Sequence, residues 1–415
     1  MSPIVLFDKS FLHSLSVDEA AVFDVLFMSN ITPLFFIETL ADLRKKMSDG
    51  RTPEQVVGNL ALKTPKMHSY PNMLHTSVAV AELTGHPIDM RGVPVVAGGR
   101  AVRSGGKDGI IFDHPPEMQA LHRWEDREFL EVERDFAADW RTTVQNAPRG
   151  VEKLLGPDGK TLRLSSLQAV ADTVDELLDS PATWVPLRAC MEMFGLRLKQ
   201  RDQLKDRWLR AGRPRLRDYA PYSAHVLRVE MIFHLGVATG QLHDDRPSNR
   251  VDLAYLHYLP FCGVFVSGDK LHRRLAPVFL KADQRFVWAH DLKADLTRLV
   301  AHYADHPEIG TEGLFRVARY PPRDGDYLVT QLYDGLRPGW RKHADAAPIQ
   351  LPPEKHTELV QQMNAMKSAP EIARGAMAIP PARGVRDADH VTYERRVPLK
   401  WGRWQFMPAD LKADC

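Results

Sequence analysis

The chain has 415 residues, of which 44% are hydrophobic and 26% charged, an ordinary composition for a soluble globular protein. Its 55 basic and 53 acidic residues nearly cancel, so a polyanionic partner would have to be held by a local basic patch. The three cysteines have neither zinc-site spacing nor the number of a disulfide framework. We find no signal peptide and no run near the roughly eighteen apolar residues of a membrane span. These features predict a cytoplasmic protein that does not contact a membrane.

The first 46 residues have the pattern of two strand–helix units. Residues 3–7 read PIVLF, a continuous apolar run typical of a buried parallel strand, and Asp8 follows it. A helix is expected over 17–28, with Ser16 as its N-cap. A second strand is expected over 31–36, followed by a helix over 37–46 whose first turn contains Glu38. An acidic residue therefore follows each expected strand.

A second strand-and-helix region begins near residue 245. Asp252 opens an apolar helix, Pro260 marks a turn, and residues 263–267 (GVFVS) form a short buried strand that Asp269 follows. A helix over 271–280, a strand over 285–289 and a helix over 291–302 are expected next. Strand ends are where open α/β sheets bind their ligands. We expect Asp252 and Asp269 to reach the same sheet edge as the first two acids.

The remaining chain divides into an insertion and an extension. Residues 48–116 are rich in Gly, Pro and His and predict loop with one short hairpin over 93–103. Helices are expected over 117–144, 165–178, 184–196, 200–209 and 223–239. Beyond about 307 the chain becomes irregular, with a helix over 354–367 and a hairpin that turns at 400–402. We therefore expect a discontinuous domain (1–46 with 245–300), an insertion (47–244) and a C-terminal extension (301–415).

Four carboxylates brought to one sheet edge would repel one another in the absence of a cation. A single aspartate after a strand is usually a helix cap or turn residue, but four acids in comparable places are harder to explain in that way. Oxygen ligands of this kind suit Mg²⁺ or Mn²⁺, and such ions can activate water and stabilise a leaving oxygen in phosphodiester cleavage. The predicted metal ligands and catalytic residues are Asp8, Glu38, Asp252 and Asp269.

The pattern resembles the PIN-domain superfamily of nucleases. The segments that match are LFDKSFL (6–12), FFIETLADL (35–43) and VDLAYLHYLPFCGVFVSGDKLHRRLA (251–276). Ser267 to Asp269 stands where the family has a Thr-x-Asp-like step, and Ser10 where it often has a hydroxyl residue. The resemblance implies a three-layer α/β/α fold with a parallel sheet and a metal-dependent endonuclease that cleaves RNA in preference to DNA. It covers about a quarter of the chain and implies nothing about the insertion.

Several side chains are candidates for substrate binding. Lys270, Arg273 and Arg274 adjoin the fourth acid, where a phosphate backbone would pass, and an exposed helix face is the alternative. Residues 210–222 mix arginines with two tyrosines, which suits RNA or single-stranded DNA, although the segment is equally typical of a surface loop. The predicted substrate-binding residues are Ser10, Ser267, Lys270, Arg273, Arg274, Arg213 and Arg215.

Other functions remain open from the sequence. One alternative is a PIN-like domain without catalysis that serves as a nucleic-acid-binding or protein-interaction scaffold. A phosphatase-like hydrolase would need a second acid two residues after Asp8, where Ser10 stands. Asp244 and Asp245 are further candidate ligands, whereas His257 and His272 are interpreted as structural. The insertion is the candidate surface for a homo-oligomer or a protein partner.

Overall fold

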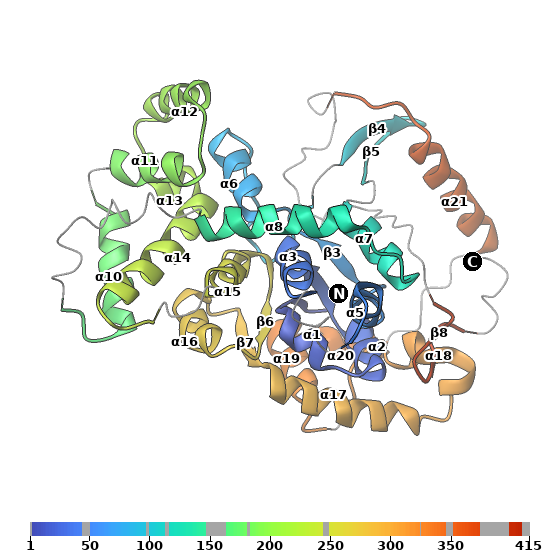
Figure 1. The fold of residues 1–415 in the computed structure, drawn as a ribbon. Coiled ribbons are helices and arrows are strands. Elements are labelled where there is room, and N and C mark those ends of the chain that lie inside the picture. Colours follow the sequence, from blue (N-terminus) through green and yellow to red (C-terminus); the bar gives the residue numbers. More distant parts are fainter. Residues whose placement is uncertain are drawn as a thin grey trace.

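A five-stranded parallel sheet lies at the centre of the computed structural model, with the strand order β3-β2-β1-β6-β7 (Figure 1). Its strands are β1 (Ile4–Phe7), β2 (Met28–Ile31), β3 (Ser69–Pro71), β6 (Val264–Ser267) and β7 (Arg285–Trp288). The structure describes residues 2–43, 50–96, 99–112, 116–146, 163–180, 183–243, 249–323, 325–345, 352–373 and 398–408. The expected helix end over 44–46 and the candidates Asp244 and Asp245 lie outside these ranges.

Strands from both predicted segments, 1–46 and 245–300, join in this sheet. More than two hundred residues lie between the end of β2 and the start of β6. In the register of the sheet, Val5 of β1 pairs with Ser29 of β2 on one side and with Val264 of β6 on the other. The Asp8 amide continues the ladder by donating to the Val266 carbonyl at 3.2 Å. The carboxyl ends of β1 and β6 therefore lie side by side, which brings Asp8 next to Ser267.

The second strand and its helix differ from the prediction. The strand is β2, and the helix α3 (Pro33–Ala41) begins where the middle of a strand was expected. Pro33 occupies the first helical position, where its fixed φ and missing amide hydrogen are tolerated. The apolar run after it is a buried helix face, which a short sequence window does not distinguish from a strand. Glu38 consequently lies in the second turn of α3 instead of the first turn of a later helix.

Helices cover both faces of the sheet. One face, formed by side chains such as Val5 and Val266, packs against α1 (Lys9–Ser14), α2 (Val17–Leu26), α17 (Ala289–Ala304) and α19 (Leu328–Leu336). The other face, with Leu6 and Phe265, packs against α6 (His75–Leu83), α14 (Pro221–Ala238), α15 (Asn249–Leu256) and α16 (Lys270–Phe279). Ser16 is the N-cap of α2, as predicted, and it forms a capping box with Glu19.

The segment over 48–116 contains more regular structure than expected. It forms α5 (Pro53–Ala61), β3, α6 and a hairpin of β4 (Arg100–Ser104) and β5 (Lys107–Ile111). The hairpin lies C-terminal to the predicted one. Its turn is at Gly105 and Gly106, which both adopt positive φ, a conformation that glycine favours.

The insertion is helical, but its first predicted helix is broken. α7 (Pro116–Glu125) and α8 (Glu131–Asn146) are separated near Arg127, which has a positive φ of 59°. The two halves of the predicted helix therefore bury different faces: Trp124 is buried, whereas Val132 is 66% exposed. Helix α8 crosses α3 and α15 (Figure 1). Further helices described after α8 are α10 (Leu167–Leu178), α11 (Trp184–Met193), α12 (Leu198–Arg210), α13 (Leu216–Tyr219) and α14.

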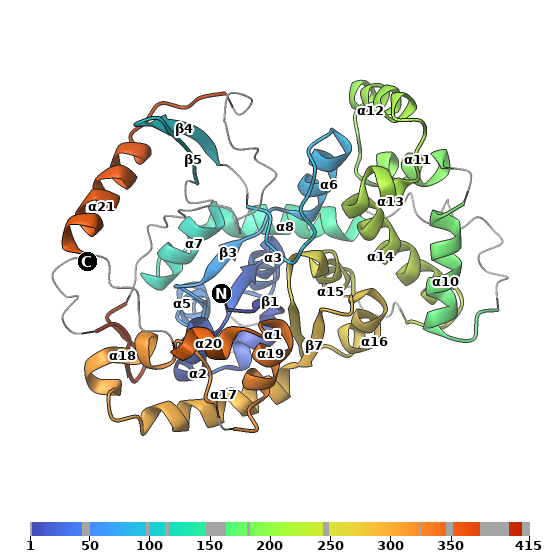
Figure 2. The ribbon, with the colours of Figure 1, turned by 180° about the vertical axis from the view of Figure 1, so that it is seen from behind.

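The C-terminal part is more helical than predicted and packs on the α/β core. It contains α18 (Ile309–Val317), α19, α20 (Trp340–Asp345), α21 (Pro353–Lys367) and the small hairpin of β8 (Lys400–Trp401) and β9 (Trp404–Gln405). Tyr333 of α19 donates to the Leu26 carbonyl, and the Trp401 indole donates to the Leu62 carbonyl. Figure 2 shows α19 and α20 in front of the sheet and α21 beside β4 and β5. None of the described helices is long and apolar enough to cross a bilayer.

Candidate active site

The four predicted acids come from four elements that meet at the carboxyl edge of the sheet. Asp8 is the N-cap of α1 and Asp269 is the N-cap of α16, each directly after or near the end of a central strand. Asp252 lies in the first turn of α15, and Glu38 in the second turn of α3. Helices α1, α3, α15 and α16 contact one another in consecutive pairs, which holds these acids on one edge.

Asp8 is buried and held by three hydrogen bonds. Its Oδ1 accepts from the Phe11 amide at 2.7 Å and from the Ser10 hydroxyl at 2.8 Å, and its Oδ2 accepts from the Ser267 hydroxyl at 2.5 Å. Donors aimed at both oxygens fix the orientation of the carboxylate. Ser10 and Ser267 therefore position Asp8, whichever role they have toward a substrate.

Ser267 also contacts the backbone of Asp269 and the ring of His272. Its hydroxyl oxygen accepts from the Asp269 amide at 2.9 Å and lies 2.7 Å from Nδ1 of His272, which is fully buried. Nε2 of His272 donates to the main-chain carbonyl of Asp252 at 2.6 Å. The chain Asp8–Ser267–His272–Asp252 thus fixes the end of β6 and the start of α16 against α15.

Glu38 interacts with one cation and one phenol. The Tyr255 hydroxyl donates to Glu38 Oε2 at 2.6 Å, and Lys9 Nζ lies 3.9 Å from Oε1 and also pairs with Asp42. Burial raises the pKa of Glu38, with smaller raising contributions from Asp8 and Asp42, against the lowering effects of Lys9 and Tyr255. Lys9, itself buried, therefore offsets part of the negative charge at the edge.

Asp252 has the most perturbed carboxyl group of the four. Its pKa is raised to about 8, chiefly by burial and in addition by the negative charges of Glu38, Asp269 and Asp8. No described residue donates a hydrogen bond to its carboxylate. Because each of the other three acids acts on Asp252, the sequence-predicted set forms one electrostatic unit.

The side chains do not form a ready metal cage. In the described ranges, no group of three or more His, Cys, Asp or Glu side chains is arranged to hold a metal ion. Charge repulsion acts over longer distances than metal coordination, which needs oxygens about 2.0–2.6 Å from the ion. The acids are thus close enough to shift a pKa, and a shared ion would require them to approach one another.

The predicted basic residues next to Asp269 lie on α16, and two of them interact with the protein. The Arg273 guanidinium stacks over the Trp288 ring at 5.1 Å, and Arg274 donates to the Gln241 carbonyl at 2.8 Å. Lys270 is exposed at the first position of the helix. Of these three, Lys270 lies nearest to the acids along the chain and remains the simplest candidate for a phosphate contact.

No contact among the described residues brings the arginine segment to the acidic edge. Arg215 pairs with Asp218 and Asp179, and the neighbouring Arg217 pairs with Asp175 of α10. Arg213 is exposed, in the turn between α12 and α13. Figures 1 and 2 place α12 and α13 in the outer part of the insertion, away from α1 and α3. It is α8 that packs on the helices of Glu38 and Asp252.

Three residues at the edge were not among the sequence-predicted site residues: Lys9, Tyr255 and His272. Lys9 lies between the predicted residues Asp8 and Ser10, and a lysine directly after an acid is a sequence signal of charge compensation. Tyr255 lies one turn after Asp252 on the same face of α15, as i and i+3 residues do. His272 had been considered and interpreted as structural, and its contacts agree with a structural role.

Comparisons with known proteins give this chain no family. No protein-family model matches it, and neither the curated proteins nor the solved structures searched yielded a match.

Replacing Ser267 tests whether this hydroxyl holds the acids in place. We expect Ser267→Ala to lower the free energy of unfolding by about 1–3 kcal/mol, because buried partners lose their hydrogen bonds. Ser29 of β2 is equally buried, but its hydroxyl has no hydrogen-bond partner within the described part of the chain. Ser29→Ala is therefore a matched control that should be neutral or slightly stabilising. Urea unfolding of both variants measures the difference, and equal effects would contradict the positioning role.

Proposed function

We propose that the protein is a metal-dependent, PIN-like endonuclease that cleaves phosphodiester bonds, with RNA favoured over DNA. The observation that carries this proposal is the electrostatic unit at the sheet edge, where three acids together with burial raise the pKa of Asp252 to about 8. Perturbed acids gathered at the carboxyl ends of parallel strands are typical of functional sites. If the edge had only a structural role, a fourth carboxylate that repels the other three would add no stability.

The donor set has the chemistry that a hard divalent cation requires. Mg²⁺ and Mn²⁺ prefer oxygen ligands, and the four side chains supply only carboxylates. Asp252 has no hydrogen-bond donor among the described residues, so its oxygens are available as ligands. We propose that Asp8, Glu38, Asp252 and Asp269 would hold one or two such ions after a local approach of their side chains.

In this reaction class a bound Mg²⁺ or Mn²⁺ activates water and stabilises the leaving oxygen. The residues of the chain have separate tasks. Ser10 and Ser267 hold the Asp8 carboxylate, Tyr255 orients Glu38, and His272 fixes the helix that carries Asp252. Lys9 limits repulsion within the set. Lys270, exposed beside Asp269, is positioned to attract the phosphate backbone.

One observation favours a second candidate, a PIN-like scaffold that binds nucleic acid or protein without catalysis. In the described residues the carboxylates do not stand in a metal-binding arrangement, and Lys9 already neutralises part of their charge. A scaffold would retain binding in the absence of divalent ions.

A cleavage assay separates the two candidates. A labelled single-stranded RNA is incubated with the protein in Mg²⁺ or Mn²⁺, and in parallel with a chelator. The nuclease proposal predicts internal cleavage only with the metal, with the DNA of the same sequence cut more slowly. Binding without cleavage under every condition would favour the scaffold.

A further inference from the structure

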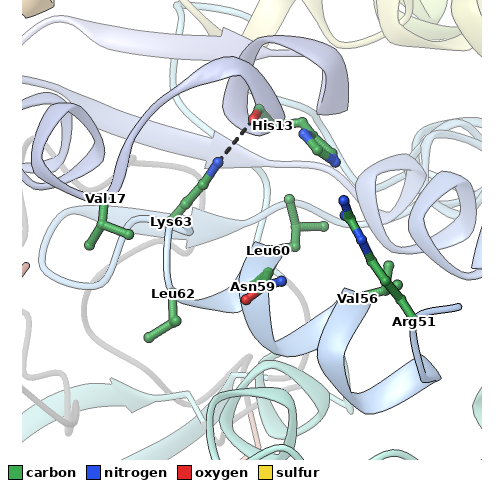
Figure 3. Close-up of a pocket in the computed structure, with 8 residues that line it drawn as sticks. All are labelled: His13, Val17, Arg51, Val56, Asn59, Leu60, Leu62 and Lys63. Carbon is green, nitrogen blue, oxygen red and sulfur yellow. Dashed lines mark hydrogen bonds between the residues drawn. The ribbon is translucent and has the colours of Figure 1, made fainter. Parts of the chain in front are cut away.

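A small pocket with a basic rim lies between the C-terminal end of α1 and helix α5. Its volume is about 200 Å³, and its walls include the apolar side chains of Val56 and Leu60 together with Asn59. Three nitrogen-bearing side chains complete it, from His13, Arg51 and Lys63 (Figure 3). No acidic side chain is among the described residues that line it. The lining therefore favours an anionic ligand.

The three nitrogen-bearing side chains reach the pocket from α1 and from the segments before and after α5. Figure 3 shows the Arg51 guanidinium and the His13 ring pointing toward each other across the cavity, with the Lys63 side chain reaching the end of α1. Lys63 Nζ donates to the His13 carbonyl at 3.0 Å, which leaves two of its three N–H donors for a ligand. Arg51 is exposed, and no hydrogen bond of its guanidinium to the described residues is found.

A second cation, Lys293, lies close enough to Lys63 to act on its charge. Burial lowers the pKa of Lys63, and the neighbouring charge of Lys293 lowers it further, opposed by Glu19. Glu19 also lies near Lys293 Nζ, at 3.8 Å, and accepts from the Thr297 hydroxyl. Lys63 thus has one cation and one carboxylate nearby, and an anion in the pocket would relieve the repulsion between Lys63 and Lys293.

Helix α1 connects this pocket to the acidic edge. Asp8 caps the N-terminus of the helix, and His13 lies in its last turn. Five residues of helix correspond to about 7.5 Å along the axis. A nucleic-acid strand that reaches Asp8 could therefore place a nearby phosphate at His13, Arg51 and Lys63.

We propose that this pocket seats a backbone phosphate of the nucleic-acid strand that is presented to the acidic edge, an inference that rests on the proposed nuclease function. The size of the pocket agrees with this ligand. It is smaller than the roughly 300–1,000 Å³ of sites that enclose whole small molecules, so it suits a phosphate group. The seat would fix the register of the strand without reading its bases.

The test measures binding of a labelled single-stranded RNA across a salt series by the full-length Asp269→Asn protein, which separates binding from cleavage. Arg51→Ala and Lys63→Met are introduced singly into this background. Arg188→Ala is the matched control, because it removes a surface guanidinium from α11 in the outer insertion. We expect each pocket variant to lower the log–log salt slope by about 0.7, the contribution of one phosphate contact on a single strand. The control should leave the slope unchanged.

A second arm distinguishes free phosphate from the strand. Inorganic phosphate is added to the same proteins, and thermal unfolding and competition with the RNA are followed. Competition that disappears in Arg51→Ala supports the seat. Unchanged salt slopes in both pocket variants overturn the inference. This holds even if inorganic phosphate binds the pocket, because the pocket would then hold an anion without holding the RNA strand. If the wild-type protein cleaves RNA while the salt slopes are unchanged, only the phosphate site in the pocket is wrong. If the protein neither binds nor cleaves RNA, both the proposed nuclease function and the phosphate site are wrong.

Discussion

Asp269→Asn is expected to reduce RNA cleavage by about 10²-fold or more, the scale on which partners of a metal site act. The substitution removes one of the three charges that raise the pKa of Asp252, and with it one ligand of the proposed ion. Stability should be equal or higher. Asn is as good an N-cap as Asp, so the hydrogen bond from the Leu271 amide to the α16 cap is retained, and one repelling charge is lost.

The matched control for this variant is Asp291→Asn. Asp291 lies in the first turn of α17, directly after the neighbouring strand β7, and its side chain is 66% exposed. The substitution makes the same chemical change on the same edge of the sheet, at a residue that is not one of the four acids. Cleavage rates and thermal unfolding of both variants give the comparison. Full activity of Asp269→Asn, or an equal loss in Asp291→Asn, would contradict the assignment of the acids.

The sequence predicted the parts of the fold that depend on local patterns. The buried runs of β1 and β6 and the N-cap at Ser16 are signals of this kind, and all three are present in the structure. The second strand was misplaced because Thr32 and Pro33 mark a helix start that an apolar run concealed. The break at Arg127 depends on a positive φ, which arginine rarely adopts and which no local pattern indicates.

The sequence indicates the acids of the candidate site, but not the contacts that support them. Asp8, Asp252 and Asp269 follow strands or open helices, so the end of a secondary structure element marks them. The hydrogen bond from Tyr255 to Glu38 joins residues 217 positions apart, and the Trp401 indole reaches Leu62 across 339 positions. Such pairs are set by packing of the complete chain. The Arg215 pairings with α10 likewise arise from tertiary packing, which is why a basic run alone was a weak sign of a binding surface.

Asp252 gives the site a defined dependence on pH. Its folded-state pKa of about 8 lies above the ordinary value of 3.8, so the folded protein binds a proton that the unfolded chain releases above pH 3.8. This contribution to stability is complete at low pH and is lost as the pH rises through about 8. A divalent cation must displace the same proton, because only the charged carboxylate is a good ligand.

The central claim, that the acidic edge binds a divalent cation, is tested most directly by calorimetric titration of the wild-type protein with Mn²⁺ between pH 6 and pH 9. We predict an affinity that rises about tenfold for each pH unit below pH 8 and levels off above it, with release of one proton per ion in the lower range. In Asp252→Asn the binding should be weaker and its dependence on pH should largely disappear. Absence of Mn²⁺ binding, or an affinity in the wild-type protein that does not change with pH, would contradict the claim.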